Sequence, residues 1–157
     1  MAKRSRRIVI ATDFSLGSAA AARAVATMYP MDSSTQIHLV HVVEPTAFSP
    51  SPPLWVDYDR ARLEDGRAQL ERAAKRLQPR LGAAKIRFAL LSGVPHVEIA
   101  RFADHVGADL ILVGTHGRTG LRHAVIGSVA ERVVRHAGRP VLTVPLGRSR
   151  RRRPRRA

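Results

Sequence analysis

Short runs of β-branched and aliphatic residues alternate with longer helical stretches along this chain, and that alternation restricts the fold more than any other feature. Five runs are expected to form strands, at residues 7–11, 36–43, 85–91, 109–113 and 141–144. A segment long enough for a helix separates each run from the next. The order βαβαβαβαβ predicts an α/β domain built on a five-stranded parallel sheet with helices on both faces.

Helices are expected in each of the four gaps. Ser15 or Ser18 is the predicted N-cap of the first helix, which continues to about Tyr29. The second helix, at 57–81, carries an apolar stripe that is predicted to face the core. That stripe repeats every seven residues and consists of Leu63, Leu70 and Leu77. The proline-rich segment 44–56 that precedes this helix is predicted to be a loop.

The last two helices carry clear start and stop signals. The third is expected to begin at Pro95, because proline is favoured in the first helical turn, and to end at Gly107. The fourth is predicted to begin with the S-x-x-E capping box formed by Ser128 and Glu131. Gly138 should follow its end.

Positive charge is concentrated at the two ends of the chain. The net charge is +15, from 27 lysines and arginines against 12 acidic residues. Residues 148–157 hold seven arginines and residues 1–7 hold four basic groups, so the remaining body is only about +4 (16 − 12). We therefore expect three parts: a basic lead-in at 1–6, a single domain at 7–146 and an Arg-rich disordered tail at 147–157.

Several classes of protein are disfavoured by what the composition lacks. There is no cysteine, which excludes disulfides, cysteine-ligated metal sites and cysteine nucleophiles. No apolar run approaches the ~18 residues that a membrane-spanning helix needs. The apolar run at 8–11 is also shorter than the ~7–15 residues typical of a secretion signal. The expectation is a cytoplasmic protein without a membrane span.

The glycine-rich segment after the fourth strand is the strongest candidate for a binding site. In doubly wound sheets ligands bind beyond the carboxyl ends of the strands, which here means residues 12–15 and the segment from Gly114 onward. Gly127 and Ser128 lie at a helix start, where free N–H groups favour phosphate. Turn geometry alone also explains the glycines. Likewise, the Ser128 hydroxyl is interpreted either as a helix cap or as a phosphate donor.

The spacing Gly114-x2-Gly117-x9-Gly127-Ser128 resembles the G-2x-G-9x-G-(S/T) signature of the ATP-binding branch of universal stress proteins. The similarity extends over roughly residues 6–145 and includes further blocks at 12–15, 41–42, 93–96 and 138–145. It implies a doubly wound, adenine nucleotide α-hydrolase-like sheet with strand order 3-2-1-4-5. It also implies an ATP-binding regulatory or stress-response module, and a homodimer paired through strand 141–144.

The same resemblance assigns roles at the carboxyl edge of the sheet. Val42 is expected to offer backbone hydrogen bonds to adenine, and Asp13 to lie near the ribose or a phosphate-bound Mg²⁺. Gly114 and Gly117 are expected to leave room for ribose and phosphates. The implied nucleotide-binding set is Ala11, Asp13, Val42, Gly114, Thr115, His116, Gly117, Arg118, Gly127, Ser128 and Val129. Ala11 stands where relatives often have proline.

Two other functions remain open at this level. An ATP-hydrolysing enzyme on the same fold would need an SGGxDS or HxGH element, and neither is present, nor is a G-x4-G-K-[ST] loop. No catalytic constellation is visible, so we expect at most slow hydrolysis. The alternative is a non-specific nucleic-acid-binding protein that uses the Arg-rich tail for weak, salt-sensitive contact with polyanions. A simply solvated tail explains the same residues.

Overall fold

The computed structural model describes residues 5–45, 52–115 and 126–145. Five parallel strands form one sheet in the order β3-β2-β1-β4-β5, which confirms the expected fold class and strand order. The elements are β1 (Arg6–Ala11), α1 (Leu16–Met28), β2 (Thr35–Val43), α2 (Pro52–Leu77), the short 3₁₀ helix η1 (Gln78–Arg80), β3 (Lys85–Ser92), α3 (Pro95–His105), β4 (Leu110–Gly114), α4 (Ser128–His136) and β5 (Val141–Val144).

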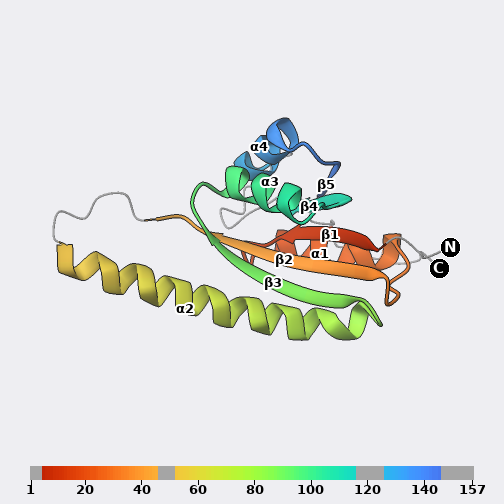
Figure 1. Ribbon diagram of the computed structural model, residues 1–157, viewed down its shortest axis with the longest axis horizontal. Coiled ribbons are helices and arrows are strands. Elements are labelled where there is room, and N and C mark those ends of the chain that lie inside the picture. Colours follow the sequence, from red (N-terminus) through yellow and green to blue (C-terminus); the bar gives the residue numbers. More distant parts are fainter. Residues whose placement is uncertain (1–4, 46–51, 116–125, 146–157) are drawn as a thin grey trace, which may run out of the picture.

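Helices cover both faces of the sheet (Figure 1). Strand β1 is central, and its side chains alternate between two cores. Ile8 and Ile10 pack with α1 and α2, whereas Val9 packs with α3 and α4. All three side chains are fully buried, which explains why this strand reads as a continuous apolar run rather than as an alternating one. The chain reverses direction across the sheet between β3 and β4, so the switch point lies between β1 and β4.

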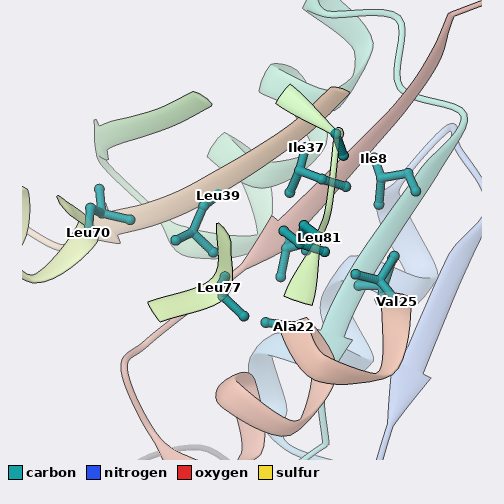
Figure 2. Packing of buried hydrophobic residues seen from close by; sticks show 11 residues of the cluster. Ile8, Ala22, Val25, Ile37, Leu39, Leu70, Leu77 and Leu81 are labelled. Carbon is teal, nitrogen blue, oxygen red and sulfur yellow. The ribbon is translucent and has the colours of Figure 1, made fainter. Parts of the chain in front are cut away.

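Helix α2 begins earlier than the sequence indicated. Residues 52–56 were assigned to a loop, but α2 starts at Pro52 and extends past the end of the sheet (Figure 1). Proline in the first turn removes no helical hydrogen bond, so Pro52 and Pro53 are compatible with a helix start. The heptad stripe packs where α2 lies over the sheet: Leu70 and Leu77 are buried against Ile37 and Leu39 (Figure 2). Leu63, nearer the N-terminus, is exposed.

The ends of two helices resolve the capping alternatives. Ser15 is the N-cap of α1, because its hydroxyl accepts the Ser18 N–H at 3.3 Å. The predicted capping box of α4 is wrong: Gly127 is the N-cap, and Ser128 is already the first helical residue. Gly127 is extended and its carbonyl accepts the Glu131 N–H. The helix therefore starts one residue earlier than a capping box would need, since that box places Ser128 at the N-cap and Glu131 at the third helical position. The Ser128 hydroxyl therefore has no capping role.

His38 on β2 makes stability depend on pH. Its side chain is buried, its ring forms a T-shaped pair with that of Phe102, and its Nε2 is the one buried side-chain nitrogen or oxygen without a hydrogen-bond partner in the described part of the chain. Burial lowers the pKa of His38 below its ordinary 6.5, and the positive charges of Arg87 and Arg7 lower it further. The unfolded chain therefore takes up this proton at a higher pH than the folded protein does.

It follows that stability is lost as the pH falls through about 6.5 toward the lower pKa of the folded state. We expect the melting temperature to fall between pH 7.5 and pH 5, and His38→Leu to flatten that dependence. His136→Gln, at an exposed site on α4, is the control for removing a histidine as such. An equally steep pH dependence in His38→Leu would assign it to other groups.

Candidate functional site

A cavity of about 340 Å³ opens at the carboxyl edge of the sheet, on the face covered by α3 and α4. It lies at the switch point, between the ends of β1, β2 and β4 and the start of α4. Its volume lies within the ~300–1,000 Å³ typical of small-molecule sites. The lining residues are Ala11, Thr12, Asp13, Ser18, Val40, His41, Val42, Glu44, Pro95, Ile99, Val113, Gly114, Gly127, Ser128, Val129 and Ala130.

Most of the site residues expected from the sequence come together here. Seven of them line the cavity: Ala11, Asp13, Val42, Gly114, Gly127, Ser128 and Val129. Thr115 does not line it but supports the wall, because its carbonyl accepts the Gly127 N–H at 2.8 Å. His116, Gly117 and Arg118 lie outside the described residues, as do Arg122, His123 and the Arg-rich tail.

The start of α4 presents unused backbone donors to the cavity. The first helical hydrogen bond is donated by Glu131, so the N–H groups of Ser128, Val129 and Ala130 have no partner among the described residues. The N–H of Gly127, a member of the implied nucleotide-binding set, is already bonded to the Thr115 carbonyl. Three N–H groups that have no partner in the described part of the chain, at the positive end of a helix dipole, form a suitable anion site.

The two described glycines of the motif are restricted by space rather than by backbone angle. A Cβ at Gly114 would lie 2.6 Å from the Gly17 carbonyl carbon and 2.9 Å from the Ser18 nitrogen. Gly114 therefore lets the first turn of α1 pack against β4, whatever ligand the cavity holds. A Cβ at Gly127 would lie 3.0 Å from the Thr115 carbonyl oxygen, although its φ of −60° is open to any residue.

Val42 offers a free backbone edge because β1 ends before β2 does. Val40 accepts the Thr12 N–H, so in the parallel register the backbone of Val42 also faces the β1 side. If the ladder continued, the Val42 N–H would donate to the Thr12 carbonyl. That carbonyl instead accepts the His41 Nδ1–H at 2.7 Å. Among the described residues, Val42 has no partner on that side. It therefore presents one donor and one acceptor to the cavity.

The charged side chains that line the described cavity are both acidic. Asp13 is half-buried, and one of its oxygens accepts the Ser15 N–H at 3.0 Å. Glu44 lies at the rim, where its carbonyl accepts a hydrogen bond from Arg62. No cluster of three or more potential metal ligands occurs in residues 5–45, 52–115 and 126–145. For a Mg²⁺ ion, these residues supply one carboxylate ligand, that of Asp13. They therefore fit a Mg²⁺ whose other ligands include the phosphate oxygens of a nucleotide.

Sequence reasoning missed the apolar walls of this cavity. They consist of Val40, Pro95, Ile99, Val113 and Ala130. Pro95 was interpreted as a helix start and as part of the 93–96 block, and Val113 as a strand residue, but neither was assigned to the site. The signal that could have found them is positional, because residues at strand carboxyl ends and at the start of a crossover helix converge on the switch point. Such walls suit a flat apolar ring.

Comparison with known proteins agrees with this geometry. Residues 4–145 match the sequence profile of the universal stress protein family. The chain belongs to the universal stress protein family. It is 36% identical over 141 residues to Universal stress protein MJ0531 of Methanocaldococcus jannaschii, covering 88% of this chain and 81% of that protein.

Solved structures show the same fold. The structure of MJ0577, also from Methanocaldococcus jannaschii, has a TM-score of 0.81 at 27% identity and covers 94% of this chain and all of that one. A universal stress protein family member from Arabidopsis thaliana, solved with AMP bound, has a TM-score of 0.65 at 21% identity over 90% of this chain and 92% of that one. At that identity the second match supports the fold alone. None of the described helices is long and apolar enough to cross a membrane.

Proposed function

We propose that this universal stress protein is an ATP-binding regulatory module, in which Mg-ATP occupies the cavity at the switch point. The observation that carries the proposal is that two sets of backbone groups, without partners among the described residues, line one cavity. The N–H groups of Ser128, Val129 and Ala130 lie at one end, and the unpaired edge of Val42 lies at the other. A phosphate group suits the first set, and a purine edge suits the second.

The rest of the cavity matches the remaining parts of such a ligand. The adenine ring would lie among the apolar walls, with its donor and acceptor edge on Val42. Asp13 would lie near the ribose or a phosphate-bound Mg²⁺, and the hydroxyl of Ser128 would donate to a phosphate oxygen. Ser128 is exposed and is not used as a helix cap, so its proton is available. AMP in the Arabidopsis thaliana relative is a precedent for an adenine nucleotide on this fold.

The proposal is for a binding protein with at most slow hydrolysis. The described residues of the cavity include no nucleophilic side chain paired with a base that a third group orients. His41 is the one histidine among the described residues that line it, and its Nδ1–H is donated to the Thr12 carbonyl. Its role is therefore to hold that carbonyl. The nucleotide would act by changing the shape or partners of a cytoplasmic protein rather than by turnover.

Calorimetric titration with Mg-ATP tests this function directly. The protein is first freed of any nucleotide carried through purification. We expect saturable binding of one nucleotide per chain, together with a rise in melting temperature, because a ligand that binds only the folded state stabilises it. The absence of both heat and thermal shift at roughly millimolar ATP would refute the proposal while leaving the fold intact.

We also propose a homodimer in which the β5 strands pair across a two-fold axis. Strand β5 lies at one edge of the sheet. The Ile111 N–H donates to the Pro140 carbonyl, and the Thr115 N–H donates to the Val144 carbonyl. The backbone groups of the even-numbered residues of β5 therefore point toward β4. The backbones of Val141 and Thr143 consequently face outward, where a second copy can pair with them.

Thr143→Pro should dissociate this dimer and leave the monomer folded. Proline removes the N–H of Thr143, which points away from β4, so it removes a donor from the interface and none from the sheet itself. Light scattering should show a dimer mass for the unmodified protein and a monomer mass for the variant. Thr143→Val keeps the N–H and should remain dimeric. A monomer mass for the unmodified protein would exclude the dimer.

A further inference from the structure

A second hollow, of about 500 Å³, lies on the opposite face of the sheet, between α1 and α2. Its floor is apolar. Leu39 of β2, Ala22 of α1 and Leu77 of α2 meet there (Figure 2), and Phe14 and Ala73 also line it. The proposed nucleotide function does not use this hollow, which we call the rear groove.

The rim of the rear groove is strongly basic. Four arginines line it: Arg23 of α1, and Arg72, Arg76 and Arg80 of α2 and η1. The last three are spaced four residues apart, which places them along one side of the helix. No aspartate or glutamate is among the lining residues, and Gln69 is the remaining polar group of the helix there.

Three of these arginines differ from Arg60 and Arg67 of α2 in having no carboxylate partner among the described residues. Arg60 and Arg67, which do not line the groove, each pair with a glutamate four residues later. Of the groove arginines, Arg72 alone has an ion pair among the described residues, with Asp65 at 4.0 Å. Within the described ranges, Arg23, Arg76 and Arg80 have none. Three exposed cations around one hollow repel one another, and a bound anion would relieve that repulsion.

We infer that the rear groove is a second ligand site, for a small phosphate-bearing amphiphile. The phosphate would be held by Arg23, Arg76 and Arg80, since guanidinium groups bind phosphate oxygens in a bidentate manner. The apolar body would lie on Leu39 and Leu77. The volume lies in the range of small-molecule sites, and the concave apolar floor suits a compact ligand better than the backbone of an extended polyanion.

The proposal predicts that monooctyl phosphate, kept below its micelle concentration, binds more tightly than either inorganic phosphate or 1-octanol in a calorimetric titration. Arg76→Glu should weaken that binding at least tenfold, and Arg80→Glu should do the same. Lys75→Glu is the matched control: it makes the same charge change on the neighbouring exposed residue, which does not line the groove, and should change the affinity less than twofold. Melting curves of all three variants show whether they remain folded.

Two further arms separate this site from the alternatives. Gly127 lines the cavity at the switch point, here called the front cavity, and does not line the rear groove, so Gly127→Val should leave monooctyl phosphate binding unchanged even if the protein binds no nucleotide. If Gly127→Val abolishes binding and Arg76→Glu does not, the amphiphile occupies the front cavity and the inference is wrong. It is equally wrong if single-stranded polynucleotide binds in an Arg76-dependent manner while monooctyl phosphate does not, because the groove then contacts a polyanion.

Discussion

Replacing Gly114 with alanine is expected to destabilise the folded protein by roughly 2–3 kcal/mol. The added Cβ would lie 2.6 Å and 2.8 Å from the carbonyl carbon and oxygen of Gly17. These are backbone atoms in the first turn of α1, so they cannot move aside as the end of a side chain can. Relief requires α1 to shift away from β4, which disturbs a packed core. A chain of this size should lose about 5–10 °C in melting temperature.

Gly138→Ala is the control for this prediction. A Cβ at Gly138 would have the Asp104 carboxylate oxygens as its nearest neighbours, at 3.7 Å and 3.8 Å, which is ordinary contact. That variant should stay within about 0.5 kcal/mol of the unmodified protein in chemical denaturation. If Gly114→Ala is equally mild, the close approach of α1 to β4 is not what the position requires, and room for a ligand becomes the better explanation.

Gly127→Val should weaken Mg-ATP binding at least tenfold, a loss of about 1.4 kcal/mol or more. Gly127 lies at the wall of the cavity, one residue before the free N–H groups of α4. Its Cβ would lie 3.0 Å from the Thr115 carbonyl, so the loop must adjust and the phosphate donors move with it. The two valine methyl groups would also reduce the space beside those donors. Calorimetric titration measures the change, and a melting curve shows how much folding is affected.

Ser128→Ala separates the backbone from the side chain at the same place. It keeps all three N–H groups and removes one hydroxyl, so binding should weaken by about 1 kcal/mol, roughly fivefold. Its stability should change little, because Ser128 does not cap α4. A purely structural loop gives a different result: Gly127→Val then lowers the melting temperature, and neither variant changes an affinity. If Ser128→Ala is the more damaging of the two to binding, the hydroxyl rather than the helix start holds the phosphate.

The sequence by itself was sufficient for the α/β class and the succession of elements, because those signals are local, whereas the strand order came from the resemblance to a known family. The fully buried run at 8–10 and the alternation of strands with helices reflect the periods of the two structures, which short windows of residues carry. Helix boundaries were less accurate. Pro52 was interpreted as loop because proline marks both loops and helix starts. Ser128 was placed one residue out because Gly127 and Ser128 are both acceptable N-caps.

The tertiary structure alone decided how those elements form the two cavities. Whether Val42 has a free edge depends on where β1 ends beside β2, and on His41 donating to the Thr12 carbonyl 29 residues away. The role of Gly114 depends on the distance between β4 and α1. The rear groove exists because Arg23 and Arg76, on different helices, line the same hollow. Such features arise from contacts between residues far apart in the chain, and no local period of the sequence specifies those contacts.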